Sequence, residues 1–377
     1  MKHALTLLDE KSAELETCGY CPKLCRAACP VSEAEPRDSL TPWGKMSLAW
    51  FAARGDVELD RDLAATAWAC TGCFSCREHC DHRNEVAHTL GAARAEFRAL
   101  GLAPAAAEAV VANFDARRRE TSHALELLAR EPGVSSSADT ALLLGCDYAT
   151  AHAAVARSAV AVAARLFGSV RLVDGCCGLP LLLAGDRGGF AENLSRLTAN
   201  VRQSRRFVVL DPGCALVLAE RGAKTLVELA SARLGLFRRV PRLAAYAQVR
   251  WQDPCKLGRG LGIYEAPRQL LSRALGRAPD EFARARGEAL CSGGGGLLPE
   301  TMPETSALIA ERRLDEHREL GGGLIVTGCA KSLKRFQGRG VEVADLFSIL
   351  DEASLHQVCP SGHFPGSSPS TAQPSDG

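Results

Sequence analysis

Two short cysteine-rich blocks near the start of the chain constrain its fold more than any other feature. Each block places four cysteines within about a dozen residues: Cys18, Cys21, Cys25 and Cys29 in the first, and Cys70, Cys73, Cys76 and Cys80 in the second. Thiolates at this density match the ligand runs of [4Fe-4S] clusters, whereas four-cysteine zinc sites favour two close pairs separated by a longer segment. The blocks therefore predict two [4Fe-4S] clusters, with a pair of zinc sites as the alternative.

The spacing also predicts how the cysteines are shared between the clusters. In two-cluster ferredoxins, the first three cysteines of a block hold one cluster and the fourth crosses to the other. The predicted ligand sets are therefore Cys18, Cys21, Cys25 and Cys80 for one cluster, and Cys70, Cys73, Cys76 and Cys29 for the other. Three residues instead of two separate Cys21 from Cys25, and Asp81 instead of proline follows Cys80. Neither departure removes a ligand.

Composition narrows the chemistry further. The chain has 377 residues, with 16 cysteines, 45 Lys and Arg residues and 44 Asp and Glu residues. This charge balance argues against a nucleic-acid partner, and no apolar run approaches the ~20 residues needed to cross a bilayer. The N-terminus lacks the long apolar core of a signal peptide, so we expect a cytoplasmic protein. Thiols stay reduced in that compartment, which argues against a disulfide framework.

Changes in composition and in the spacing of apolar residues divide the chain into four segments. Residues 1–133 contain both cysteine blocks and have helical spacing of apolar residues. Residues 138–240 and 241–356 each alternate short apolar runs with helical stretches, which is typical of α/β units with a parallel sheet. Residues 360–377 are rich in Ser, Pro and Gly and predict a disordered tail. The expected fold class is α+β overall: an all-α two-cluster ferredoxin-like domain followed by two tandem Rossmann-like α/β units.

Six short segments rich in apolar residues carry the expectation of parallel sheets. They are residues 141–144, 170–173 and 207–210 in the first unit, and residues 249–251, 324–326 and 341–343 in the second. Helices are expected over residues 150–167, 190–202 and 304–320.

The cysteines of the two units repeat in register. Cys177 and Cys214 are 37 positions apart, and so are Ser292 and Cys329. The cysteine motifs follow expected strands, and ligands of open α/β sheets bind beyond the carboxyl ends of the strands. We therefore expect the thiols of each unit to converge.

Two motifs in the second unit are the most distinctive in this part of the chain: Asp253-Pro254-Cys255-Lys256-Leu257-Gly258-Arg259 and Cys291-Ser292-Gly293-Gly294-Gly295-Gly296. With the cysteine blocks, they resemble the heterodisulfide-reductase-like iron-sulfur proteins over residues from about 14 to 350. That family includes iron-sulfur subunits of glycolate oxidase and anaerobic glycerol-3-phosphate dehydrogenase, a lactate-utilisation protein and catalytic subunits of heterodisulfide reductases. The resemblance implies a two-cluster ferredoxin segment followed by two cysteine-rich CCG domains.

The resemblance also implies metal sites in the two units. The full family motif has five cysteines per domain and, in its best-developed members, holds a non-cubane [4Fe-4S] cluster that reduces disulfides. The first unit retains Cys146, Cys176, Cys177 and Cys214, with Asp211 at the fifth position. The second retains Cys255, Cys291 and Cys329, with Ser292 and Val326 at the other two. We expect the first unit to be able to hold a third Fe-S cluster or zinc, and the second unit to lack a complete five-thiolate site.

Two alternatives stay open for these segments. The seven cysteines of the units could be small buried residues without a metal, because free cysteine packs as an apolar side chain. The run from Gly293 to Gly296 could be a phosphate cradle, but no Lys-Ser or Lys-Thr pair follows it. We instead expect the glycines to let the backbone approach the cysteine site.

Three functions are compatible with these features. The first is an electron-transfer subunit that needs a flavoprotein dehydrogenase or other redox subunit, because the chain has no flavin or nicotinamide fingerprint after a strand. Peripheral membrane association would then occur through that partner. The second is an enzyme that acts on a disulfide or quinone-type acceptor at the first unit, although the chain lacks a complete substrate site of its own. The third is a non-redox zinc or scaffold protein.

Overall fold

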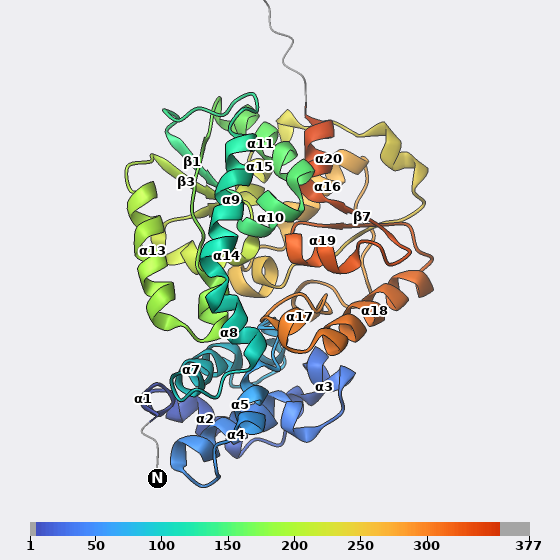
Figure 1. The fold of residues 1–377 in the computed structure, drawn as a ribbon. Helices are drawn as coiled ribbons and strands as arrows, with labels where there is room; N and C mark the ends of the chain where they lie inside the picture. Colours follow the sequence, from blue (N-terminus) through green and yellow to red (C-terminus); the bar gives the residue numbers. More distant parts are fainter. Residues whose placement is uncertain (1–4, 355–377) are drawn as a thin grey trace, which may run out of the picture.

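The computed structural model describes residues 5–354, so the expected tail at residues 360–377 lies outside the described residues. The N-terminal part is helical, and two α/β units lie beside one another above it in Figure 1. The chain is mostly helical, with two small parallel sheets.

Short helices separated by irregular turns build the N-terminal part, which carries both cysteine blocks. They are α1 (Thr6–Asp9), α2 (Ser12–Gly19), α3 (Pro30–Ala34), α4 (Pro42–Arg54), α5 (Arg61–Ala65), α6 (Ser75–Glu78), α7 (Val86–Ala99), α8 (Ala105–Ala112) and α9 (Phe114–Leu128). Helix α4 shows why the sequence folds this way locally. Thr41 caps its first turn, Pro42 occupies the first helical position, and Gly55 ends it in a left-handed conformation.

The first α/β unit is a four-stranded parallel sheet in the order β2-β1-β3-β4. The strands are β1 (Thr140–Leu143), β2 (Arg171–Leu172), β3 (Arg206–Val209) and β4 (Lys224–Thr225), and the helices are α10 (Cys146–Ala151), α11 (Ala153–Phe167), α12 (Leu179–Ala184), α13 (Arg187–Val201), α14 (Pro212–Leu218) and α15 (Leu226–Ser231). Helices cover both faces of this sheet. Ala141 and Leu143 pack in one core with α13 and α14, and Leu142 packs in another with α11 and α15.

The second unit has three parallel strands in the order β5-β6-β7. Its elements are β5 (Val249–Trp251), the π-helical turn η7 (Lys256–Gly260), α16 (Glu265–Leu275), α17 (Leu298–Thr301), α18 (Pro303–Glu319), β6 (Leu324–Thr327), α19 (Ala330–Phe336), β7 (Glu342–Asp345) and α20 (Leu346–Ala353). Leu324 and Val326 share one buried core with α11, α15, α16 and α20, so the two units are packed on common apolar side chains. The labelled helices of this core lie between the two sheets in Figure 1.

The six expected strands are all present, each within a residue or two of its expected bounds. The helix expected over residues 150–167 is interrupted at His152, so that α10 and α11 are separate helices. Strand β4 and the turn η7 were not predicted.

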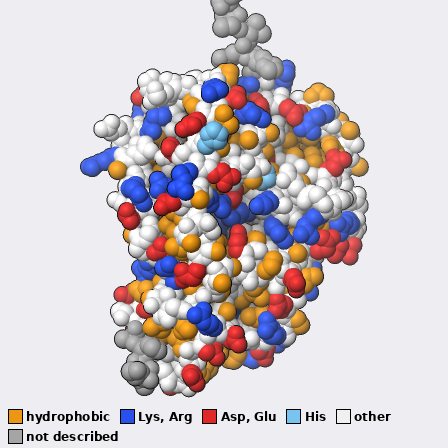
Figure 2. All heavy atoms as spheres, in the orientation of Figure 1, with side chains coloured by type: hydrophobic (Ala, Val, Ile, Leu, Met, Phe, Trp, Pro, Cys, Tyr) orange, Lys and Arg blue, Asp and Glu red, His pale blue; other side chains and the backbone are white. Residues whose placement is uncertain are grey.

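The surface agrees with the balanced composition. Lys, Arg, Asp and Glu side chains are interspersed over the face drawn in Figure 2. Within residues 5–354, we find no helix with the length and apolar character needed to cross a membrane.

Candidate iron-sulfur sites

The predicted ligands of one cluster lie around a common cavity of about 150 Å³. We call Cys18, Cys21, Cys25 and Cys80 the outer site. Cys18 lies at the end of α2, and Cys80 follows α6. Asn84 donates a hydrogen bond from Nδ2 to the Cys18 sulfur at 3.1 Å. Burial, followed by the neighbouring thiols, raises the pKa of Cys18 to about 12. Such a group of buried thiols loses its protons only where a metal compensates the charge, which suits a cluster.

The predicted ligands of the other cluster line a second, smaller cavity. We call Cys29, Cys70, Cys73 and Cys76 the inner site. Cys76 lines both cavities, so the two sites are neighbours. The loop that carries Cys70 and Cys73 turns sharply before α6, which carries Cys76, with positive φ angles of 61° at Gly72 and 62° at Phe74. Burial and the nearby thiols raise the pKa of Cys76 well above its ordinary value.

Cationic side chains from the ferredoxin-like part point at the inner site. Lys45 is 2% exposed, and its Nζ lies 3.7 Å from the Cys29 sulfur and donates to the Ala69 carbonyl at 2.6 Å. Arg94 is 3% exposed and donates from Nη2 to the Cys70 carbonyl at 3.1 Å. Burial lowers the pKa of Arg94, and the Cys70 thiol partly offsets this shift.

Two more cations reach the same loop from the second α/β unit. Arg259 is 6% exposed and donates from Nε to the Cys73 carbonyl at 2.7 Å. Lys256 donates to the Gly72 carbonyl, and its Nζ lies 4.3 Å above the centre of the Phe74 ring. We call Lys45, Arg94, Lys256 and Arg259 the cationic ring.

The cationic ring provides a test of whether the residues fit a cluster. Among residues 5–354, the ion pairs found involve none of its four members, so no carboxylate balances these charges. A buried cation without a counter-charge costs several kcal/mol. Four cysteine thiolates bound to iron supply negative charge at this place, so the donor set and its surroundings fit a [4Fe-4S] cluster.

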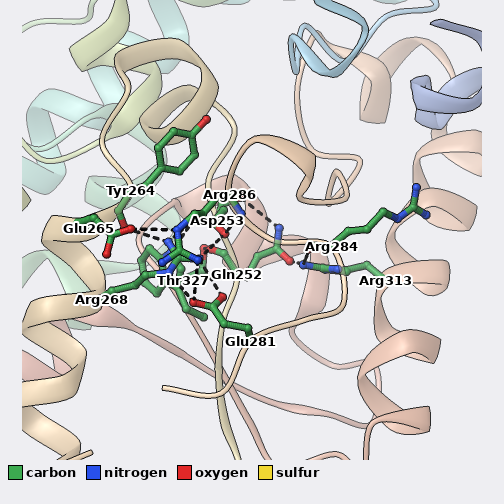
Figure 3. Close-up of polar contacts among 11 residues, drawn as sticks. Gln252, Asp253, Tyr264, Glu265, Arg268, Glu281, Arg284, Arg286, Arg313 and Thr327 are labelled. Atoms are coloured by element: carbon green, nitrogen blue, oxygen red, sulfur yellow. Dashed lines mark hydrogen bonds and ion pairs between the residues drawn. The ribbon is translucent and has the colours of Figure 1, made fainter. Parts of the chain in front are cut away.

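A buried polar network holds the loop that delivers Lys256 and Arg259 (Figure 3). Asp253 accepts two hydrogen bonds from Arg268, both at 2.8 Å, and the pair is almost fully buried. Asp253 also accepts from Trp251 Nε1 at 3.0 Å and from the backbone N–H of Arg286 at 2.8 Å. The first residue of the Asp253-Pro254-Cys255 turn is therefore fixed from three directions.

Glycines allow the second unit to approach the cysteine block closely. A Cβ atom on Gly296 would lie 1.8 Å from the Cys70 carbonyl oxygen, and one on Gly295 would lie 2.3 Å from the Thr71 oxygen. Gly296 also has a positive φ of 69°. The glycine run thus lets backbone approach a cysteine site, but that site belongs to the ferredoxin-like part of the chain.

The four cysteines of the first unit gather in a buried row. Hydrogen-bonding contacts join Cys146 to Cys176, Cys176 to Cys177, and Cys177 to Cys214. The neighbouring thiols and burial hold the pKa of Cys146 well above its ordinary value. Arg117 lies 3.4 Å from the Cys146 sulfur, so one cation faces the end of the row.

Asp211, the residue at the fifth motif position, caps α14 by accepting from the N–H groups of Gly213 at 2.8 Å and Cys214 at 3.0 Å. Its carboxylate therefore already has a structural partner. Among residues 5–354, no group of three or more His, Cys, Asp or Glu side chains is arranged to hold a single metal ion.

Two protein families match parts of the chain that carry cysteines. Residues 14–84 match the 4Fe-4S dicluster domain family, and residues 249–331 match the cysteine-rich CCG domain family. A subunit of the dihydromethanophenazine:CoB–CoM heterodisulfide reductase of Methanosarcina barkeri is 20% identical over 355 residues, covering 84% of this chain and 87% of that protein. A subunit of the fumarate reductase (CoM/CoB) of Methanothermobacter marburgensis is 23% identical over 359 residues, covering 87% and 70%. The chain is a 4Fe-4S dicluster and CCG domain protein related to heterodisulfide reductase subunits.

A third relative of this CCG domain protein has no assigned activity. An uncharacterised iron-sulfur protein of Methanocaldococcus jannaschii is 24% identical over 382 residues, covering 90% of this chain and 74% of that protein. The CCG match falls on the second α/β unit, which we call the CCG region. The CCG character of the first unit therefore rests on the internal repeat and stays a prediction.

The cysteines of the two α/β units do not form two separate groups. The thiols of Cys291 and Cys73 are in hydrogen-bonding contact, so the second unit touches the inner site directly. Burial raises the pKa of Cys255, and the nearby Cys73 thiol adds to this shift. Burial likewise raises the pKa of Cys329, and the nearby Asp211 carboxylate adds to it. The remnant cysteines of the second unit thus lie between the inner site and the first unit, and their role as metal ligands stays a prediction.

Sequence reasoning missed the cationic ring. Lys256 directly follows Cys255 and Arg259 lies four positions after it, and cations beside a cysteine motif were the available signal. Lys45 lies on the buried face of α4 next to Met46, where a charged residue needs a partner. No pattern along the chain indicates which carbonyl groups these side chains reach.

Proposed function

We propose that this chain is the iron-sulfur electron-transfer subunit of an oxidoreductase complex, relaying electrons between a flavoprotein dehydrogenase partner and a further acceptor. The observation that carries the proposal is the pairing of two four-cysteine sites, one beside the other, with the inner one in contact with the CCG region. When bound, [4Fe-4S] clusters exchange single electrons without themselves supplying substrate chemistry.

Different residues have different roles in this proposed electron relay. The eight cysteines hold the outer and inner sites as the predicted ligands, Asn84 orients Cys18, and the cationic ring balances the charge of the inner site. The second α/β unit packs directly on the loop of the inner site through Lys256, Arg259 and the glycine pair Gly295-Gly296. A redox partner is supported by the relatives, two of which are named as subunits of reductases.

The test is anaerobic purification followed by iron, sulfide and zinc analysis and by low-temperature EPR before and after dithionite. The relay requires about eight irons per chain, with the interacting signals of two neighbouring clusters. It also requires that the isolated chain shows no turnover with disulfide or quinone acceptors. Zinc in place of iron would refute the proposal and support a zinc or scaffold protein.

A second function is favoured by the cysteine row of the first unit. Four buried thiols in contact, with Arg117 at the Cys146 end, are suited to a third cluster that acts on a disulfide or quinone-type acceptor. Asp211 caps α14 in place of a fifth cysteine, which weighs against this function. About twelve irons per chain, together with disulfide-dependent oxidation of the reduced protein, would establish it.

A further inference from the structure

The outer and inner sites differ in the charges that surround them. At the inner site, each member of the cationic ring donates to a cysteine sulfur or to a carbonyl of the loop from Ala69 to Cys73. Three of the four are at most 6% exposed. Their charges therefore act through protein interior, where Coulomb interactions are several times stronger than in water.

The outer site lacks an equivalent. Among the described residues, the hydrogen bonds found at outer-site sulfurs come from neutral groups: the side-chain amide of Asn84 at Cys18, and backbone N–H groups, including that of Trp43, at Cys25. Lys23 lies between two outer cysteines in the sequence, but its side chain is 37% exposed and turns to Asp38 and to the Trp43 ring. Solvent therefore screens its charge.

We propose that the cationic ring sets the reduction potential of the inner site above that of the outer site, so that reducing electrons settle on the side that faces the CCG region. This inference rests on the proposed function, because it requires a [4Fe-4S] cluster at each site. Reduction adds one negative charge to a cluster, and nearby cations and hydrogen bonds to the cysteine ligands favour the reduced state. Burial alone would act in the opposite direction, because it disfavours added charge.

The CCG region provides two of the four members of the cationic ring. Lys256 and Arg259 belong to the second unit, and the network around Asp253 fixes the loop from which they extend. The motif around Cys255 thus acts on the neighbouring inner site, although the second unit has an incomplete set of cysteines of its own. The two residues act through the carbonyls of Gly72 and Cys73, so they are positioning residues.

An EPR-monitored redox titration of the anaerobically purified full-length protein tests the inference. Wild type should be reduced in two steps, and the Cys25→Ala and Cys73→Ala variants assign the steps to the outer and inner sites. Arg259→Gln should shift the higher-potential, inner step to lower potential and leave the outer step in place. Arg259→Lys, which keeps the charge, should restore most of the wild-type value.

Several results would overturn the inference. One is an Arg259→Gln variant with full iron content and two unchanged steps, and another is an inner step at lower potential than the outer one. If Arg259→Gln loses iron, the Lys256→Met variant provides the test, because it leaves the Arg259 guanidinium in place. A shift of its inner step to lower potential would support the proposed effect of the cationic ring, and an unmoved inner step would refute it. Failure of the proposed function looks different: wild type would contain fewer than about eight irons, or the isolated chain would turn over disulfide or quinone acceptors.

Discussion

Replacing Asp253 by Asn should weaken the anchor of the loop that reaches the inner site. The change keeps the shape of the side chain but removes its charge and turns an acceptor into an N–H donor that faces Arg268. In the native protein, Arg268 donates twice to Asp253 at 2.8 Å, with side-chain exposures of 6% and 4% for the two residues. Little solvent is available to replace the lost partner.

The magnitude follows from the burial of the pair. Removing one partner of a buried ion pair costs about 3–5 kcal/mol. Arg268 keeps Glu281, which accepts at 2.6 and 2.9 Å, so the cost should be near the lower end, at about 3 kcal/mol. For a folded region of roughly 200 residues, a loss of 1 kcal/mol lowers Tm by about 2–4 °C. The expected decrease in Tm is therefore about 6–12 °C.

Anaerobic thermal unfolding at one fixed scan rate measures this decrease, because unfolding of a cluster protein is irreversible and depends on scan rate. The matched control is Glu281→Gln, which removes the other carboxylate of Arg268. Glu281 is 33% exposed, so water can replace it, and its loss should cost about 1 kcal/mol or less. Equal decreases in the two variants, or a decrease below about 2 °C in Asp253→Asn, would refute the assignment of Asp253 as the buried anchor.

Three further predictions follow from the structure. Gly296→Ala should separate the CCG region from the inner site and reduce the iron content, because the new Cβ would lie 1.8 Å from the Cys70 carbonyl oxygen. Gly262→Ala is the control for backbone strain, since Gly262 has a φ of 75° and no atom within 4 Å of a Cβ at its position. Burial raises the pKa of Asp345 from 3.8 to about 7, so its native state favours the protonated carboxyl and stability should fall as pH rises toward 7. Asp345→Asn should flatten this fall when Tm is compared at pH 5.5 and 7.5, and an unchanged slope would contradict it. Cys73→Ala should lose about four irons, and unchanged iron content would contradict the ligand set.

Features that are local in sequence could be predicted from the chain alone. The cysteine blocks could be recognised because cluster ligands lie a few residues apart in sequence. Residues 324–326 could be recognised as a strand because buried parallel strands are continuous apolar runs. Strand β4 was missed because two residues, Lys224 and Thr225, carry no apolar pattern. The interruption at His152 was missed because helical spacing continues through it.

Contacts between distant segments could not be predicted. Cys73 and Cys291 were assigned to different sites because each fits a local motif, yet their thiols touch. The convergence of Lys45, Arg94 and Arg259 on one loop depends on how the helical part and the second unit pack, which no periodicity encodes. The internal repeat indicated two similar units but not that they share one buried core.

The central claim is that the two cysteine blocks hold two [4Fe-4S] clusters. Iron and sulfide analysis of the anaerobically purified protein, combined with EPR of the dithionite-reduced state, tests it most directly. The account predicts about eight irons and eight sulfides assigned to the outer and inner sites, with spin interaction between neighbouring clusters. Zinc without iron, or a single isolated cluster signal, would contradict it.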